Sequence, residues 1–382
     1  MRFLFRDLSQ LGSNEQCSKL SAHACFHLSR SSTRRKLKAM RSLTMCMVLV
    51  ALSPRMSVGQ SPRDSASAGS CADGRIGTRR GHAMAYDPIS RGVVLFGGTS
   101  GDAKDPEPRS LWSWDGTRWR CLSSDGPPGR DAPELAFDSE RKRLVLYGGR
   151  ARGADRQFRV LTDTWEWDGT RWMQLDSVGP RPRRLHQVLG YDPSRRAVLL
   201  HGGLNTDDGG KPLSDTWRWT GVRWETVPGA IPLIGIENHN ALMTTSGGVV
   251  LLMQVKDSTG CPPSGRWQRA RARLLEFRDG AWNVLASDGP CISGLPPAAL
   301  TPDGIVLVNG GAPGSPWPSD SWLWRNRAWQ RIESMPTTHR AARAAYDPVR
   351  KRAVFFGGDD AAGMLGDTWE WDGERWRLIT VR

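Results

Sequence analysis

The chain has 382 residues, of which 38% are hydrophobic and 24% are charged, a balance that excludes a disordered tail and a polytopic membrane protein. Its net charge is +14, but residues 1–59 account for +8, and the small excess left over residues 60–382 argues against nucleic-acid binding. Tryptophan is the outlier, with 18 copies against 4 tyrosines and 9 phenylalanines. The fold therefore uses an indole repeatedly.

Residues 1–59 are expected to form a leader with a secretory signal peptide at about 34–59. The basic cluster 34–41 precedes an apolar run over 43–52, and small residues follow at Ser57 and Gly59, in the order of a signal peptide and its cleavage site. The apolar run is about ten residues long, whereas a stable membrane span needs roughly 20. A membrane anchor or a buried helix is the alternative.

Residues 1–33 show no periodicity, so this stretch either precedes the true start or is an unusually long basic region of the signal. The mature protein is expected to begin near Gln60, to be exported to the periplasm or the extracellular space, and to have no stable membrane span. Residues 60–78 are rich in Ser, Ala, Gly and Arg and predict a flexible lead-in.

From residue 79 to 382 one pattern recurs six times. A strand ends in an acidic turn, as at Tyr86-Asp87-Pro88, and an apolar strand with a glycine doublet, a variable loop, Trp-x-Trp and a third tryptophan follow. The units are expected at about 79–129, 130–182, 183–234, 235–292, 293–338 and 339–382. The fourth unit departs, because Leu252 and Met253 stand in place of the doublet and Leu275 and Phe277 replace two tryptophans.

The repeated residues have a structural explanation. In Trp-x-Trp both indoles face one side of a strand, and a two-residue turn with Gly116 at its first position places Trp114 opposite Trp119. The glycine doublet marks a backbone position with positive φ or a close approach by a neighbour. The residues assigned to this architecture are Gly97, Gly98, Trp114, Trp119, Gly148, Gly149, Trp167, Trp172, Gly202, Gly203, Trp219, Trp224, Gly310, Gly311, Trp324, Trp329, Gly357, Gly358, Trp371 and Trp376.

These residues carry a family resemblance. The hydrophobic strand, the glycine doublet and the tryptophan at a fixed offset resemble the kelch repeat of the superfamily of galactose-oxidase-like central domains. The resemblance covers residues 79–382 and implies an all-β fold, a six-bladed β-propeller of four-stranded blades. It also implies that the sixth blade packs against the first.

In a propeller of this strand order, the loops after the doublets emerge on one face together with the links between blades. These long loops, at 99–110, 150–163, 204–214, 254–273, 312–319 and 359–366, are where we expect recognition, whereas the opposite face has only tight turns. The candidate ligand-binding residues are Arg150, Arg152, Arg156, Arg159, Arg266, Trp267, Arg269, Arg271 and Arg273. Guanidinium groups pair with carboxylates and sulfates, and an indole stacks on a sugar ring, so an anionic polymer fits. The alternative is that these are solvated loop charges.

The resulting hypothesis is an exported, non-enzymatic propeller that binds a protein or glycan partner through its long-loop face. We expect a monomer with no cofactor, no metal and no nucleic-acid partner. The alternative is a secreted sugar-modifying enzyme, oxidase- or epimerase-like, with its site at the mouth of the axial channel. Convergence of His82 and His186 with Glu134 or Glu237 would favour the enzyme, and a channel lined by Ala and Leu would favour the binding protein.

Residues 60–382 contain four cysteines, an even number that suits an oxidising compartment. Cys261 lies in the long loop of the fourth unit and Cys291 follows its last strand, so both are expected to emerge on the same face and to form a disulfide. Cys71 and Cys121 are expected to pair and to pin the lead-in to the first unit. The alternative is four unpaired thiols.

Overall fold

The computed structural model describes residues 71–101, 108–229, 236–255, 261, 270–292, 296–309, 320–335 and 339–379, without the side chains of 236–240 and 242. These residues all belong to one compact unit, Ser57–Arg382. The predictions for the leader and for Arg266, Trp267, Arg269, Gly310 and Gly311 lie outside the described residues. Regular structure in the described part is entirely β, and no helix there is long and apolar enough to cross a membrane.

The described strands form six antiparallel sheets of four main strands, here called sheets 1 to 6 in chain order. Sheets 1 to 3 contain β2 (Ala83–Asp87), β3 (Gly92–Phe96), β5 (Leu111–Trp114) and β6 (Trp119–Ser123); β7 (Glu134–Asp138), β8 (Arg143–Tyr147), β11 (Thr164–Trp167) and β12 (Trp172–Asp176); and β14 (Val188–Asp192), β15 (Ala197–His201), β18 (Thr216–Trp219) and β19 (Trp224–Val227).

Sheets 4 to 6 follow the same order. They contain β20 (Ile236–Thr245), β21 (Gly248–Val255), β22 (Ala270–Arg278) and β23 (Ala281–Ala286), with β24 (Cys291–Ile292) paired to β22; β25 (Ala298–Thr301), β26 (Gly304–Asn309), β27 (Asp320–Arg325) and β28 (Ala328–Ile332); and β29 (Arg343–Asp347), β30 (Arg352–Phe356), β33 (Thr368–Trp371) and β34 (Trp376–Ile379).

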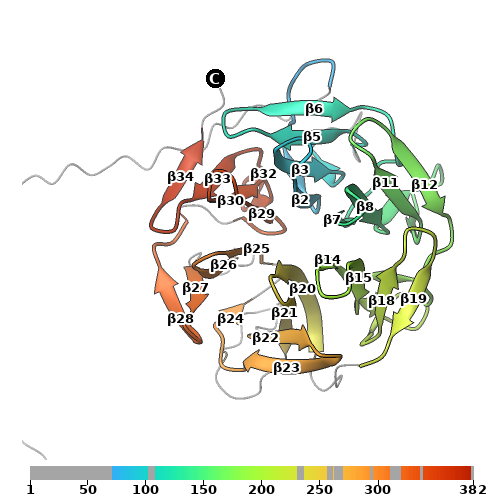
Figure 1. Cartoon of the computed structure of the whole chain (residues 1–382). Helices are drawn as coiled ribbons and strands as arrows, with labels where there is room; N and C mark the ends of the chain where they lie inside the picture. The colour runs from blue at the N-terminus through green and yellow to red at the C-terminus, as the bar shows by residue number, and fades with distance from the viewer. Residues whose placement is uncertain are drawn as a thin grey trace, which may run out of the picture. The chain divides into compact units, whose positions relative to one another are not determined.

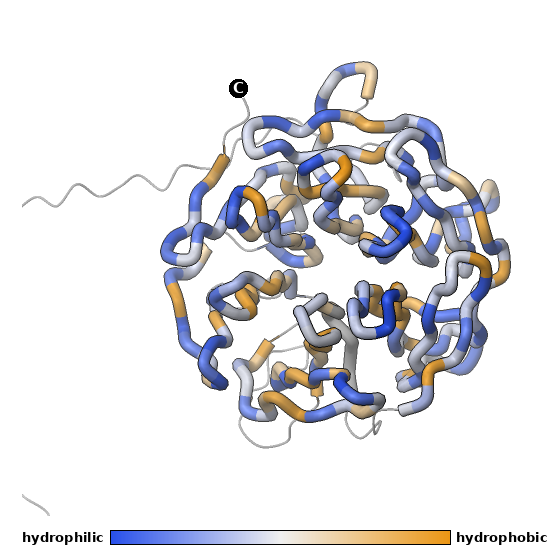
Figure 2. Tube along the Cα trace, in the orientation of Figure 1, coloured by the Kyte–Doolittle hydropathy of each residue, from blue (hydrophilic) through white to orange (hydrophobic). Residues whose placement is uncertain are grey.

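The first strand of each sheet lies innermost, and each of these strands contacts the first strands of the two neighbouring sheets, including β29 with β2 (Figure 1). Six hydrophobic clusters each join two neighbouring sheets, and the cluster between sheets 6 and 1 contains Phe356 and Trp114. The second strand of each sheet, such as β3 or β15, is mostly hydrophobic and buried, and hydrophobic segments recur around the ring of sheets (Figure 2). Because each sheet buries both faces against its neighbours, the arrangement is compatible with a β-propeller.

The repeat residues adopt the geometry that the sequence predicts. Trp114 lies opposite Trp119 in the register of β5 and β6, with ring centroids 5.5 Å apart, and Gly116 in the turn between them has φ +99°. At Gly98, with φ +93°, a Cβ atom would lie 2.7 Å from the carbonyl oxygen of Arg80. The doublet is therefore needed both for its backbone conformation and for the close approach of a neighbouring strand.

The long loops are partly folded into two- and three-stranded ribbons. They are β1 (Arg79–Arg80) with β4 (Thr99–Ser100), β9 (Arg150–Arg152) with β10 (Phe158–Val160), β16 (Leu204–Asn205) with β13 (Arg184–Leu185) and β17 (Lys211–Pro212), and β31 (Asp359–Asp360) with β32 (Gly363–Met364). The loop predicted at 254–273 is shorter than expected, because β21 continues to Val255 and β22 begins at Ala270.

Both expected disulfides are present. Cys71 is bonded to Cys121 and Cys261 to Cys291, with Cα atoms 5.4 Å and 5.6 Å apart. The first ties the segment before sheet 1 to β6, and the second ties the loop of sheet 4 to β24.

Candidate functional site

The hairpin β9–β10 brings together the four predicted arginines of sheet 2. Val160 lies opposite Arg150 and Phe158 lies opposite Arg152, and Arg156 adopts φ +61° in the connecting turn. Antiparallel pairing puts opposed side chains on the same face of the ribbon. The guanidinium carbons of Arg150 and Arg152 consequently lie 4.5 Å and 4.9 Å from the centre of the Phe158 ring.

The arginines of this hairpin differ in how they are held. Arg150 donates to Asp131 at 2.9 and 2.7 Å, so its head group is fixed beside Phe158. Arg159 pairs at 3.1 Å with Asp155 on the surface, where such a pair contributes little to stability. Arg152 and the 46%-exposed ring of Phe158 share one face of the ribbon, whereas Arg159, opposite Ala151, points to the other face. All three are exposed, as is Arg156 in the turn.

The described residues of the second predicted arginine group lie elsewhere in the fold. Arg271 and Arg273 belong to the strand β22, where they pair in register with Val255 and Met253. Arg271 donates a hydrogen bond of 3.0 Å to the carbonyl oxygen of Gly289. The structure places these two arginines within sheet 4 and does not bring them onto the β9–β10 hairpin.

A set of buried arginines was not predicted from the sequence. Arg79, Arg130 and Arg184 have no exposed surface, and each donates to the carbonyl oxygen of the first glycine of a doublet, 18 residues later. Arg130 also donates at 2.6 and 3.0 Å to Asp163, and Arg184 donates at 2.7 and 2.8 Å to Asp215. The constant spacing between arginine and glycine was the signal that would have identified them.

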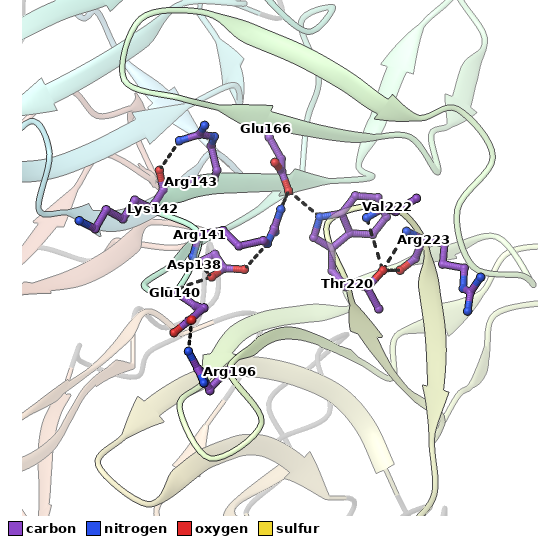
Figure 3. A network of polar contacts seen from close by, with 11 residues as sticks. Asp138, Glu140, Arg141, Lys142, Arg143, Glu166, Arg196, Thr220, Val222 and Arg223 are labelled. Carbon is purple, nitrogen blue, oxygen red and sulfur yellow. Dashed lines mark hydrogen bonds and ion pairs between the residues drawn. The ribbon is translucent and has the colours of Figure 1, made fainter.

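A second missed network crosses the interface between sheets 2 and 3 (Figure 3). Glu166, on β11, accepts a hydrogen bond of 2.6 Å from the indole Nε1 of Trp219 and pairs with Arg141. Arg141 also donates at 2.9 Å to Asp138, which is fully buried. Many of the arginines in this basic chain therefore stabilise the sheet interfaces and are not available to a partner.

An axial cavity of about 420 Å³ lies among the first strands. Its lining is mostly alanine, leucine, methionine and aromatic side chains, and Glu134 and Arg343 are the charged residues among them. His82 and His186 are not part of the lining, and the side chain of Glu237 is not described. Within the described residues no group of three or more His, Cys, Asp and Glu side chains is placed to hold a metal ion.

Burial shifts the pKa values of the titratable groups near Glu134 and Arg343. Burial raises the pKa of Glu134 to about 7, against the opposing effect of Arg343. Burial, followed by the positive charge of Arg343, lowers the pKa of both His82 and His186. Neither ring nitrogen of His82 has a hydrogen-bond partner among the described residues. A buried imidazole in this setting is neutral at pH 7.

No family model and no curated protein matches the chain. Among solved structures, the one entitled "Structure of YjhT" matches with a TM-score of 0.59 and 14% sequence identity, over 81% of this chain and 100% of that chain. At this level of identity the similarity concerns the fold alone.

Proposed function

We propose that the protein is an exported, non-enzymatic, six-bladed kelch-type propeller that binds an anionic partner through its long-loop face. Each of the six sheets is one proposed blade. Six sequence repeats, six four-stranded sheets and the contacts of β29 with β2 support this count. The signal-like leader and two disulfides support export, because disulfides persist in oxidising compartments.

One observation carries the binding site: the stack of Arg150 and Arg152 on the exposed ring of Phe158. The ring covers one side of each guanidinium. Nε and Nη2 of Arg150 already donate to Asp131, whereas Arg152 is exposed and presents its planar guanidinium beside the ring, a shape suited to pairing with a carboxylate or sulfate. Segment 150–160 contains four arginines and only one acidic residue, Asp155. The surface therefore favours a polymer that presents repeated negative charges beside an apolar or sugar face.

The cavity composition favours binding over catalysis. The alternative, a sugar-modifying enzyme, would be favoured by His82 and His186 beside an acid at the channel. The described lining of the cavity instead combines small and apolar residues with one carboxyl group, that of Glu134. The non-enzymatic function is therefore the one we put forward.

The hairpin is tested with the variant Arg152→Ala/Arg156→Ala/Phe158→Ala, which removes two charges and the stacking ring. Binding to polygalacturonate, poly-L-glutamate and uncharged dextran is measured by biolayer interferometry at low and high salt. We expect at least a fivefold loss of affinity for the anionic polymer that binds, and weaker binding of the native protein at high salt, because salt screens exposed charges.

The matched control is Arg218→Ala/Arg223→Ala, which removes two exposed arginines from β18–β19 and should leave binding unchanged. Binding to polygalacturonate alone identifies a glycan partner, and binding to poly-L-glutamate alone identifies a protein. Equal affinity of the triple variant and the native protein contradicts the hairpin site. Export is tested separately by sequencing the N-terminus of exported protein, where an intact Met1 would contradict the signal peptide.

A further inference from the structure

The axial cavity is built from equivalent positions of the six first strands. The second-last residue of each first strand lies at the same position in the register, just before the strand ends in its turn. These six residues form a collar: Tyr86, Phe137, Tyr191, Thr244, Leu300 and Tyr346. The residue that precedes the collar residue is small in five of the six strands. The six residues at this position are Ala85, Ala136, Gly190, Met243, Ala299 and Ala345. The small ring leaves the space that the collar surrounds.

Two residues earlier in the chain than this small ring, the first strands of sheets 2 and 6 carry charged residues. Glu134 and Arg343 stand where sheets 1, 3 and 4 have Ala83, Val188 and Ala241. The contact from Arg343 Nη2 to Glu134 Oε1 is 3.6 Å, which is longer than a hydrogen bond. Neither group has another hydrogen-bond or ion-pair partner among the described residues, although their side chains are only 16% and 19% exposed.

A mostly buried guanidinium normally uses its donors, because each unsatisfied polar group in a low-dielectric site costs free energy. Arg343 and Glu134 instead face a cavity with apolar walls. We propose that this cavity binds a small carboxylate with an apolar body, whose carboxylate pairs with Arg343 and contacts Glu134 while its body lies among the small ring and the aromatic collar. This site is separate from the β9–β10 hairpin.

Charge balance favours a carboxylate over a neutral or cationic head group. With its proton retained, Glu134 donates a hydrogen bond and leaves the positive charge of Arg343 to be neutralised by the ligand. A cationic ligand would be repelled by Arg343. At the opposite end the turn residues Pro88, Ser139 and Pro348 and the collar residue Thr244 line the cavity and are exposed, so the ligand enters from the tight-turn face.

Binding is expected to depend on pH through Glu134, whose buried carboxyl has a pKa of about 7. Among the described residues, the other charged or titratable groups near Glu134 and Arg343 are His82, His186, Asp131, Arg79 and Arg150. Arg343 and burial lower the pKa of the two histidines, so both are neutral at pH 7. Above pH 7 the Glu134 carboxylate repels the ligand, and affinity should fall about tenfold between pH 6 and pH 8.

The test is isothermal titration calorimetry of the oxidised protein at pH 6 with 3-phenylpropionate, 3-phenylpropionamide and 3-phenylpropylamine. These probes share one body and differ only in the head group. We expect the carboxylate to bind at least tenfold more tightly than the amide, and the amine not to bind. Arg343→Ala should abolish the preference for carboxylate, and Ala85→Leu, which fills the small ring, should weaken binding of the carboxylate and the amide alike.

Arg343→Ala and Glu134→Gln are expected to fold, because other sheets have neutral residues at this position, and tryptophan fluorescence during thermal unfolding checks this. Glu134→Gln should retain binding and lose the pH dependence. The hairpin variant Arg152→Ala/Arg156→Ala/Phe158→Ala should bind 3-phenylpropionate normally, which separates this site from the polymer site. Failure of all three probes to bind, equal affinity for carboxylate and amide, or an unchanged preference in folded Arg343→Ala would overturn the proposal.

Discussion

The interface between sheets 2 and 3 and the interfaces of sheet 4 are stabilised by different kinds of contact. At the former, Glu166 and Thr164 of sheet 2 accept hydrogen bonds of 2.6 and 2.8 Å from the indole groups of Trp219 and Trp224 of sheet 3. In sheet 4 the residue equivalent to Glu166 is Glu276, and its carboxylate pairs at 2.9 Å with Arg278 of the same strand. The described residues of sheet 4 thus lack the equivalent network.

Sheet 4 relies on apolar contact and a covalent link. Leu275 and Phe277 occupy two tryptophan positions and pack in one cluster with Val188 and Leu199 of sheet 3. Its first three strands are also longer than those of the other sheets, and the Cys261–Cys291 disulfide joins its loop to β24. The comparison shows that the repeat requires bulky apolar side chains at these positions, while its polar network is replaceable.

Two buried indole groups, within the part of the chain that the structure describes, lack partners because the preceding sheet has no acceptor at the equivalent position. Trp172 would need a threonine in sheet 1, where Leu111 stands, and Trp371 would need a glutamate in sheet 5, where Leu323 stands. Both Nε1 atoms are buried without a partner among the described residues, whereas Trp114 and Trp119 donate to Glu370 and Thr368. The residue of the preceding sheet does not decide every case, because Thr216 stands at the position equivalent to Thr164 but contacts His201, and the Nε1 of Trp282 has no partner among the described residues.

The largest expected effect is that of Glu166→Ala. It should lower the free energy of unfolding by about 3–5 kcal/mol, because it leaves the buried Trp219 Nε1 without its acceptor and removes one of the two carboxylates that hold the partly buried Arg141 guanidinium. The matched control is Glu276→Ala in sheet 4, where only a pair within one strand is lost and about 1 kcal/mol or less is expected. Urea unfolding followed by tryptophan fluorescence measures both. Equal losses would show that the polar network does not distinguish the two regions.

The second largest expected effect is that of removing the Cys261–Cys291 disulfide, which joins the loop of sheet 4 to β24. Cys261→Ser/Cys291→Ser should cost about 3–4 kcal/mol, the chain-entropy expectation for closing a loop of this length. Hydrogen exchange should show lost protection in β22 and β24 above all. The control Cys71→Ser/Cys121→Ser should instead expose β6. Protection lost evenly over all six sheets would contradict a local role of the Cys261–Cys291 bond.

Part of this fold can be predicted from the sequence, because each repeat unit contains the residues that its own turns and strand pairings need. The register of Trp114 with Trp119 follows from a two-residue turn, and the backbone of Gly98 follows from the doublet. The buried Arg130 was not predicted, because an arginine in a loop segment normally indicates solvent, and only its distance from Gly148 distinguishes it. An axial channel was expected from the resemblance, but the ring of small residues that opens the cavity was not predicted, because it emerges only when one position, such as that of Ala85, is compared across all six strands.

The smallest expected effect isolates one hydrogen bond, that from Trp224 to Thr164. Trp224 and Trp282 are the third tryptophans of sheets 3 and 4, and each ring stacks on an aromatic neighbour of its own sheet, Trp219 at 5.3 Å and Phe277 at 4.8 Å. Trp224 also donates at 2.8 Å to Thr164, whereas the Nε1 of Trp282 is buried without a partner among the described residues. Trp→Phe removes similar ring volume at both sites, so Trp224→Phe should cost about 1 kcal/mol more than Trp282→Phe, the net value of one hydrogen bond. Repeating both substitutions in a Thr164→Val background should reduce that difference toward zero, and a difference that persists there would mean that ring packing alone separates the two sheets.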